Sequence, residues 1–167
     1  MSHVEHRRLA PASVGCYVLT VSDTRTAATD TSGDAIAALL EKAGHRITGR
    51  AIVKDDPALV RDAVTRQLAN GDVQAIITTG GTGISSRDST YEAVSALLQK
   101  TLDGFGEIFR TLSYQDIGSP AIMSRACAGL AAGRIIIALP GSEKAVRLAC
   151  EKLIVPELAH MVQQASK

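Results

Sequence analysis

A glycine-rich segment from Thr78 to Thr90 has the composition of an anion-binding loop. Its turn-forming residues are Gly80, Gly81, Thr82 and Gly83. Three glycines in four residues allow a tight turn in which backbone N–H groups point inward. An apolar run at 73–77 precedes the loop and a helical pattern follows from Tyr91, so the start of a helix adds partial positive charge. The segment predicts a phosphate-binding loop, and a plain turn is the alternative interpretation.

The loop differs from the two commonest nucleotide-binding motifs. It lacks the Gly-Lys-Ser/Thr sequence with which a P-loop reaches the β and γ phosphates and magnesium. It also lacks the third glycine of a dinucleotide fingerprint, because Ile84, Ser85 and Ser86 follow Gly83. The sequence therefore argues against a P-loop NTPase and against a Rossmann dehydrogenase.

Asp88 lies between the glycine loop and the predicted helix. Ser89 and Glu92 have the spacing of a capping box, which places Ser89 at the helix N-cap and Asp88 just before it. The simplest role of such a carboxylate is to complement the helix dipole. Because a carboxylate beside an anion repels it unless a metal ion or a proton intervenes, Asp88 also indicates magnesium-assisted chemistry or proton transfer.

Asp55 and Asp56 follow a second predicted strand and precede Pro57. They could simply cap the next helix. In a parallel sheet, however, this loop and the glycine loop share one edge, so the pair could also bind metal near a bound phosphate. Magnesium usually takes one or two carboxylates together with substrate oxygens. Asp55 and Asp56 are therefore the candidate metal ligands.

Two further polar loops are expected at the same edge. The candidate substrate-binding residues in them are Ser22, Asp23, Thr24, Pro140, Gly141 and Ser142. Ser142 is a natural helix N-cap, and the glycine before it would let a ligand approach closely. A turn or a cap is the alternative for each loop taken alone. Four small polar loops on one edge favour a binding site.

The order of elements predicts an α/β fold. Strands are expected at 15–21, 45–53, 73–77, 127–131 and 134–139, and helices at 33–44, 57–70, 91 to about 100, and from 142 with an interruption at Pro156. The alternation β-α-β-α-β-α predicts a mainly parallel, doubly wound sheet with helices on both faces. Ala132-Gly133 between the last two strands predicts a hairpin that adds one antiparallel strand.

Length and composition limit the classes of protein. A chain of 167 residues with 46% hydrophobic residues fits one domain, expected at 14–167 after a polar, mobile tail at 1–13. Aromatic residues at 3% and a net charge of +1 argue against nucleic-acid and membrane partners. No signal peptide or membrane span is recognisable, so a cytoplasmic location is expected. Three widely spaced cysteines predict buried free thiols.

Several motifs together resemble the MoaB/MogA family of molybdenum-cofactor biosynthesis proteins. They are Val18 to Asp23, Thr78 to Asp88 in the form TTGGTGxxxRD, Gly104-Phe105-Gly106-Glu107, Ser124-Arg125, and Leu139 to Ser142. Their order and spacing extend the resemblance from about residue 14 to residue 160. The segments Gly118 to Arg125 and Pro140 to Lys144 look more like the MoaB branch than the MogA branch.

The resemblance implies a three-layer α/β/α sandwich that binds molybdopterin and forms a homotrimer or a hexamer. Active members are adenylyltransferases, in which molybdopterin phosphate attacks the α-phosphate of Mg-ATP and pyrophosphate leaves. A separate downstream enzyme inserts molybdate. Some MoaB proteins lack the first acidic residue and are inactive, so a non-catalytic molybdopterin-binding or scaffold protein is the alternative function.

The resemblance also assigns roles to particular residues. The two aspartates that active members need correspond to Asp55, with Asp56 as a near alternative, and to Asp88. Asp55 is expected to hold magnesium, and Asp88 to orient magnesium or a substrate group. The N–H groups of Gly80 to Gly83 and the helix start at Ser142 are expected to hold phosphate and pterin. Lys54 departs from the family, which often has proline before the first acid.

Overall fold

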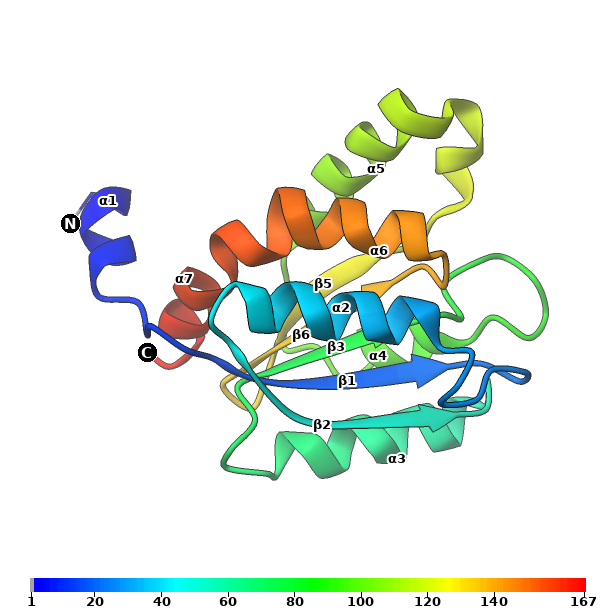
Figure 1. The fold of residues 1–167 in the computed structure, drawn as a ribbon, viewed down its shortest axis with the longest axis horizontal. Coiled ribbons are helices and arrows are strands. Elements are labelled where there is room, and N and C mark those ends of the chain that lie inside the picture. The colour runs from blue at the N-terminus through cyan, green and yellow to red at the C-terminus, as the bar shows by residue number, and fades with distance from the viewer. Residues whose placement is uncertain (1) are drawn as a thin grey trace.

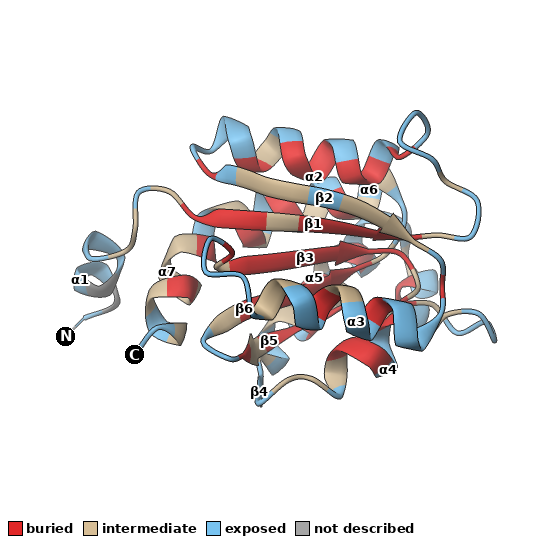
Figure 2. Ribbon diagram, turned by 90° about the horizontal axis from the view of Figure 1, so that it is seen from below, coloured by how far each residue is buried: buried red, intermediate tan, exposed pale blue. Residues whose placement is uncertain are grey.

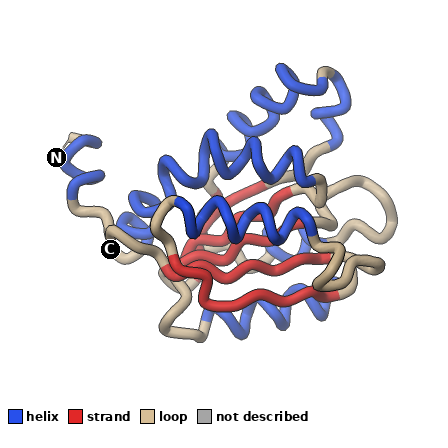
Figure 3. The backbone as a smooth tube through the Cα atoms, in the orientation of Figure 1, coloured by secondary structure: helices blue, strands red, loops and turns tan. Residues whose placement is uncertain are grey.

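A six-stranded sheet lies between two layers of helices in the computed structural model, which describes residues 2–167 (Figure 1, Figure 3). The strands are β1 (Gly15–Val21), β2 (Arg46–Val53), β3 (Ala75–Thr79), β4 (Lys100–Thr101), β5 (Cys127–Ala131) and β6 (Arg134–Leu139). The helices are α1 (His3–Arg8), α2 (Thr31–Lys42), α3 (Pro57–Leu68), α4 (Thr90–Ser95), α5 (Asp103–Ile117), α6 (Glu143–Ala149) and α7 (Val155–Ala165), with a 3₁₀ helix η1 (Ser119–Met123) and a π-helical segment η2 (Cys150–Ile154).

The strand order is β2-β1-β3-β6-β5-β4. Neighbouring strands among β2, β1, β3 and β6 pair in parallel, while β5 pairs antiparallel with both β6 and β4. The predicted hairpin and the predicted single antiparallel strand are therefore confirmed. The chain passes from β1 to β2 on one side and then crosses to β3 on the other. This makes the carboxyl ends of β1 and β3 a topological switch point, where open α/β sheets usually bind ligands.

Each face of the sheet carries its own hydrophobic core. Alternate residues of β1, such as Val18 and Leu19, face opposite layers, as the two-residue period of a strand requires. One core packs the sheet against α2, α5, α6 and α7, and the other packs it against α3 and α4. In Figure 2 the inner strands β1 and β3 are mostly buried, whereas the edge strand β2 is not. The three-layer arrangement predicted from the sequence is confirmed.

Three local differences from the sequence-based expectations have clear causes. The expected tail contains α1, because Ser2 and Glu5 form a capping box, and Arg7 of this helix pairs with Glu157 of α7. The helix after the glycine loop ends at Ser95 rather than near residue 100, because Lys100–Thr101 pair with β5 as the short strand β4. Before Pro156 the helix widens into η2, since proline has no N–H to continue the regular ladder.

Within residues 2–167, no helix combines the length and the apolar character that crossing a bilayer requires. Cys16, Cys127 and Cys150 are buried free thiols, as predicted. Burial raises the pKa of Cys16 and Cys150 to about 12 and that of Cys127 to about 11. These thiols therefore stay protonated near neutral pH and are poor nucleophiles.

Candidate functional site

The four polar loops predicted to share one edge lie at the carboxyl ends of β1, β2, β3 and β6. Side-chain and backbone contacts connect them. Gly80 N donates to Leu139 O at 3.0 Å, and Thr79 Oγ1 donates to Pro140 O at 2.8 Å. A Cβ atom on Gly80, whose φ is +98°, would lie 2.1 Å from Val21 O at the end of β1. The glycine loop is thus pressed into the switch point between β1 and β3, where only glycine fits.

Asp55 is the buried member of the acidic pair, with an exposed fraction of 8%. Its N–H donates to Asp23 Oδ1 at 3.1 Å, and its Oδ1 accepts from Ser89 N at 3.2 Å and from Ser89 Oγ at 2.8 Å. Its Oδ2 lies 3.0 Å from the position of a Cβ on Gly81. Asp55 therefore joins the loops after β1 and β2 to the start of α4, with Oδ2 directed toward the glycine loop.

The predicted capping box at Ser89 and Glu92 is wrong, although Ser89 does occupy the N-cap position. Its side chain makes no cap hydrogen bond, because its hydroxyl donates to Asp55 instead. The carboxylate of Glu92 is paired with Arg125. A buried acceptor on a neighbouring loop competes with the local cap for the same hydroxyl, and local spacing cannot reveal this.

Asp88 closes the far side of the glycine loop. Its Oδ2 accepts from Ser85 N at 2.9 Å and from Ser85 Oγ at 2.7 Å. The same oxygen lies 2.6 Å from the position of a Cβ on Gly83. The glycine loop is therefore flanked by two carboxylates, Asp55 at Gly81 and Asp88 at Gly83.

Asp56 has a different role in the structure from Asp55. Its Oδ1 accepts from Ala58 N at 2.9 Å and from Leu59 N at 3.3 Å, so it caps α3. Within residues 2–167, no three His, Cys, Asp or Glu side chains form a group that could hold a metal ion. Magnesium therefore fits this edge only if substrate oxygens complete its shell. Asp55 Oδ2, which enters no hydrogen bond among the described residues, is the suitable protein ligand.

Asp23 is held by Arg87, which lies in the loop before α4. The guanidinium donates from Nε to Asp23 Oδ2 at 3.0 Å and from Nη2 to Oδ1 at 2.9 Å. This hydrogen bonding, followed by that from the Asp55 N–H, lowers the pKa of Asp23. Both partners are exposed, so an incoming anion can reach Arg87. Ser22 Oγ accepts from Thr24 N at 3.2 Å and from Arg25 N at 3.0 Å, so it shapes its own turn.

Arg125, two residues before β5, holds the glycine loop by hydrogen bonds. Its Nε and Nη2 donate to Gly83 O at 2.9 Å and 2.6 Å, and Nη2 also donates to Asp88 O at 3.3 Å. Its guanidinium lies 5.1 Å from the centre of the Tyr91 ring, a cation–π contact. Its pairing with Glu92 lowers the pKa of that carboxyl. Arg125 thus positions three parts of the site at once.

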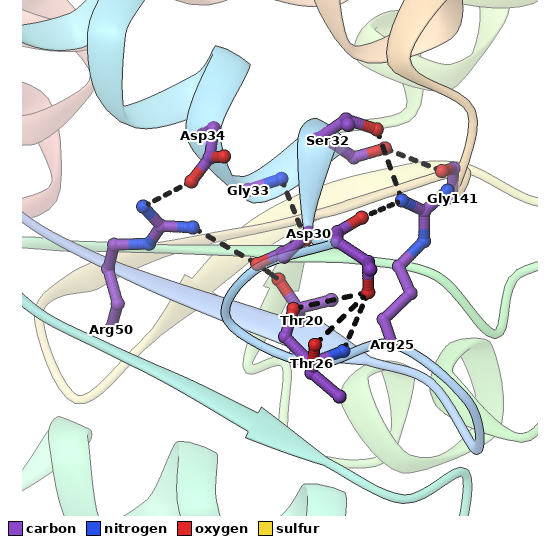
Figure 4. Close-up of polar contacts among 11 residues, drawn as sticks. Thr20, Arg25, Thr26, Asp30, Ser32, Gly33, Asp34, Arg50 and Gly141 are labelled. Atoms are coloured by element: carbon purple, nitrogen blue, oxygen red, sulfur yellow. Dashed lines mark hydrogen bonds and ion pairs between the residues drawn. The ribbon is translucent and has the colours of Figure 1, made fainter.

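A network centred on Asp30 supports the loops after β1 and β6 (Figure 4). Asp30 is buried and accepts from Thr20 Oγ1 at 2.7 Å, from Gly33 N at 3.0 Å and from Arg50 Nη2 at 3.1 Å. Beside it, Ser32 Oγ donates to Gly141 O at 2.6 Å. The start of α2 is therefore tied to the loop that carries Ser142.

The loop from Pro140 to Ser142 is placed as predicted. Ser142 caps α6, accepting from Ala145 N at 3.3 Å, and a Cβ on Gly141 would lie 3.4 Å from Gly80 Cα.

The buried hydroxyls of Thr78 and Thr90 have no hydrogen-bond partner within residues 2–167. Thr90 Oγ1 lies 2.1 Å from the position of a Cβ on Gly81, so the hydroxyl itself fills the space that glycine leaves.

Sequence reasoning missed Arg87, Arg125 and Asp30 as site residues. A signal existed for two of them. Asp30 precedes Thr31 and a helical pattern, as an N-cap should, and Arg125 precedes a strand whose reversed direction brings its amino end to the site. Arg87 stands in the motif TTGGTGxxxRD, but its pairing with Asp23 joins residues far apart in the sequence and could not be read from that motif.

Comparisons with known proteins find relatives in molybdenum cofactor biosynthesis over almost the whole chain. A family model described as a probable molybdopterin binding domain matches residues 17–160. A molybdenum cofactor biosynthesis protein B from Bacillus cereus is 51% identical over 162 residues, which cover 96% of each chain. The crystal structure of a tungsten cofactor synthesizing protein MoaB from Pyrococcus furiosus, 34% identical, superposes with a TM-score of 0.85 over 95% of this chain and 100% of that one. A MogA structure, 32% identical, gives 0.82 over 90% and 99%.

Proposed function

We propose, because this chain belongs to the MoaB/MogA family of probable molybdopterin-binding domains, that it binds molybdopterin and adenylylates it with Mg-ATP. The observation that carries this proposal is the placement of two carboxylates on one glycine loop, Asp55 beside Gly81 and Asp88 beside Gly83. A loop of backbone donors with flanking carboxylates suits a reaction in which phosphates meet a magnesium ion.

In the proposed reaction a terminal phosphate oxygen of molybdopterin attacks the α-phosphorus of ATP. A new phosphorus–oxygen bond forms while the bond from the α-phosphorus to the bridging oxygen breaks, and pyrophosphate leaves with the electron pair. The attacking phosphate is already ionised near neutral pH, so no general base is required. The protein mainly positions two anions and offsets their charge.

Particular residues would divide these tasks. The N–H groups of Gly81, Thr82 and Gly83 would hold a phosphate, since the N–H of Gly80, expected to share this role, donates to Leu139 O instead. The guanidinium of Arg87 would offset the charge of the phosphate. Asp55 would hold magnesium, which supplies charge neutralisation at the phosphates when bound. Asp88, through its hydrogen bonds with Ser85, would keep the loop in the conformation that receives the substrate. The loop from Pro140 to Ser142 would contact the pterin-bearing substrate.

The direct test is formation of adenylylated molybdopterin from molybdopterin, ATP and magnesium. We expect Asp55→Asn to lower kcat by about 10² to 10³-fold, the cost of removing one oriented electrostatic contact. Asp88→Asn keeps an acceptor for Ser85 but loses the charge that strengthens these hydrogen bonds, so we expect it to lower kcat by about tenfold. Asp56→Asn keeps an N-cap side chain and should stay within threefold of wild type if its role is capping. Asp62→Asn, at an exposed position on α3, is the matched control. A wild-type protein that forms no adenylylated pterin rejects the catalytic proposal.

The second candidate function is a non-catalytic molybdopterin-binding or scaffold protein. One observation favours it: Asp88 Oδ2 and Asp55 Oδ1 each accept two hydrogen bonds within the protein, as purely structural carboxylates do. Equal molybdopterin affinity in wild type and in both Asn variants, with no ATP turnover in any, would support this function. If the protein is the adenylyltransferase of the first proposal, its adenylylated product would pass to a separate enzyme that inserts molybdate.

A further inference from the structure

A recess of about 370 Å³ lies beyond Arg125, at the same edge of the sheet as the glycine loop. Its lining comes from α4, from the start of α5 and from the residues that lead into β5. Tyr91 and Arg125 both line it. Arg125 stacks over the Tyr91 ring and donates a hydrogen bond to Gly83 O of the glycine loop. The recess is therefore next to the proposed phosphate site, and its volume falls in the range of small-molecule pockets.

Three charged side chains of α5 border the recess, namely Asp103, Glu107 and Arg110. Their spacing of four and three residues places them on one side of the helix. Within residues 2–167, the carboxylates of Asp103 and Glu107 enter no hydrogen bond and no ion pair. The recess thus offers uncommitted acceptors beside a cationic donor.

Gly106 makes room for the guanidinium of Arg110. Arg110 Nη1 donates to Ala126 O at 3.0 Å, which holds the side chain across the recess. A Cβ on Gly106 would lie 2.7 Å from Arg110 Nη2 and 3.0 Å from Ala126 O. Gly104, two residues earlier, has nothing within 4 Å of its Cβ position. The two glycines of this helix start therefore differ, and only Gly106 is required for space.

We propose that this recess binds the 2-amino-4-oxopyrimidine ring of the pterin, with Glu107 and Arg110 as its specificity-determining residues. The inference rests on the proposed function. The amino group and the neighbouring ring N–H of a pterin are adjacent donors that suit a carboxylate such as Glu107, and the ring carbonyl suits a guanidinium such as Arg110. Adenine carries its amino group beside ring-nitrogen acceptors, N1 or N7, and has no second adjacent donor, so it would give the Glu107 carboxylate one hydrogen bond where the pterin gives two. The recess is therefore assigned to the pterin and not to ATP.

The first experiment measures molybdopterin binding without ATP and, separately, ATP binding without molybdopterin. Glu107→Gln and Arg110→Ala should each weaken molybdopterin binding at least about tenfold, since each removes a charge-assisted hydrogen bond, while ATP affinity stays within twofold. Glu41→Gln, at an exposed position on α2, is the control. 6-Hydroxymethylpterin, which is fluorescent and has no phosphate, is the second probe and should show the same order of affinities.

Alanine substitutions at Gly104 and Gly106 distinguish an effect on pterin binding from an effect on folding. Gly104→Ala and Gly106→Ala both improve helix propensity, so neither should lower the thermal midpoint through the helix itself. Gly106→Ala should displace Arg110 and reproduce the binding loss of Arg110→Ala, whereas Gly104→Ala should bind like wild type. Equal binding by the two alanine variants, or a loss of ATP affinity in place of pterin affinity, overturns the assignment.

The outcome is separable from that of the proposed function. If the protein forms no adenylylated product and the recess variants still lose pterin affinity, the assignment of the recess stands and catalysis falls. If adenylylation proceeds in the recess variants with an unchanged KM for molybdopterin, the assignment falls and catalysis stands.

Discussion

At Gly81 and Gly83, oxygen atoms occupy the space in which any other residue would carry its side chain. Thr90 Oγ1 and Asp55 Oδ2 crowd Gly81, and Asp88 Oδ2 crowds Gly83. Gly81 also has a φ of +72°, so its backbone alone favours glycine, whereas Gly83 is required for space only. The glycine pattern thus reflects the flanking side chains as well as the turn.

Gly83→Ala tests this reading at one residue. The new methyl group would displace the Asp88 carboxylate, which is the end of a short side chain at a partly exposed position, so the fold should survive with a loss of about 1–2 kcal/mol. Adenylylation should fall at least about tenfold, because the loop geometry depends on Asp88. Steady-state kinetics and denaturant unfolding measure the two effects. Gly71→Ala, where a Cβ meets nothing within 4 Å, is the control; unchanged kinetics in Gly83→Ala would contradict the reading.

The loops of the site are held by residues from the elements around them. Asp30 joins three elements, since it caps α2, accepts from Thr20 of β1 and pairs with Arg50 of β2. Asp34, one turn further along α2, pairs with the same arginine at 2.8 Å but has 58% of its side chain exposed, against 2% for Asp30. The same guanidinium therefore has one buried and one exposed partner.

Asp30 and Asp34, the two partners of Arg50, give a matched prediction on the free energy of unfolding. Asp30→Ala should lower the free energy of unfolding by about 2–4 kcal/mol, because it removes a helix cap and leaves a partly buried arginine without its inner partner. Asp34→Ala should change it by no more than about 0.5 kcal/mol, as for other exposed ion pairs. Urea unfolding of both variants measures the difference, and similar losses in the two would show that burial does not decide the effect.

His45, the residue before β2, predicts a pH dependence of stability. Its Nδ1 accepts from Val14 N at 3.1 Å, and burial lowers its pKa from the ordinary value of 6.5. The unfolded chain then binds more protons than the folded one in a window below pH 6.5, so stability falls as the pH falls through that window. Unfolding free energies measured from pH 7.5 to pH 5 should show this slope. In His45→Gln the slope should be smaller, and an unchanged slope would exclude His45 as its source.

The sequence predicted the elements and their common edge well, because strand and helix periodicity is local and parallel strands bring their carboxyl ends together. Asp88 was predicted at the end of the glycine loop and Asp55 on a neighbouring loop at the same edge, and the structure places both carboxylates against the glycines. The bonding of Ser89 to Asp55, the pairing of Arg87 with Asp23 and the bracing of Gly83 by Arg125 were not predicted. Each joins segments separated by more than 30 residues, so no local pattern carries the information.

On the scale of the whole molecule, exposed large apolar side chains are concentrated in α5 and η1. In Figure 1 α5 extends beyond the sheet, away from β1 and β2. Large apolar side chains are exposed there, namely Ile108, Tyr114, Ile117, Ile122 and Met123. Exposed apolar side chains concentrated in one region are typical of protein–protein contacts. The expected homotrimer or hexamer would provide such contacts.

We predict that the protein is a trimer or a hexamer in solution and that this region contributes to the assembly. Ile122 has an exposed fraction of 81%, so Ile122→Asp costs the monomer little, yet a carboxylate buried in an interface is strongly unfavourable. Sedimentation equilibrium should give the mass of an assembly for wild type and a lower mass for Ile122→Asp at the same concentration. Leu59→Asp, at a 45% exposed position on α3 across the sheet, should leave the mass unchanged. A monomeric wild type would exclude the assembly, and a full-size Ile122→Asp assembly would place its contacts elsewhere.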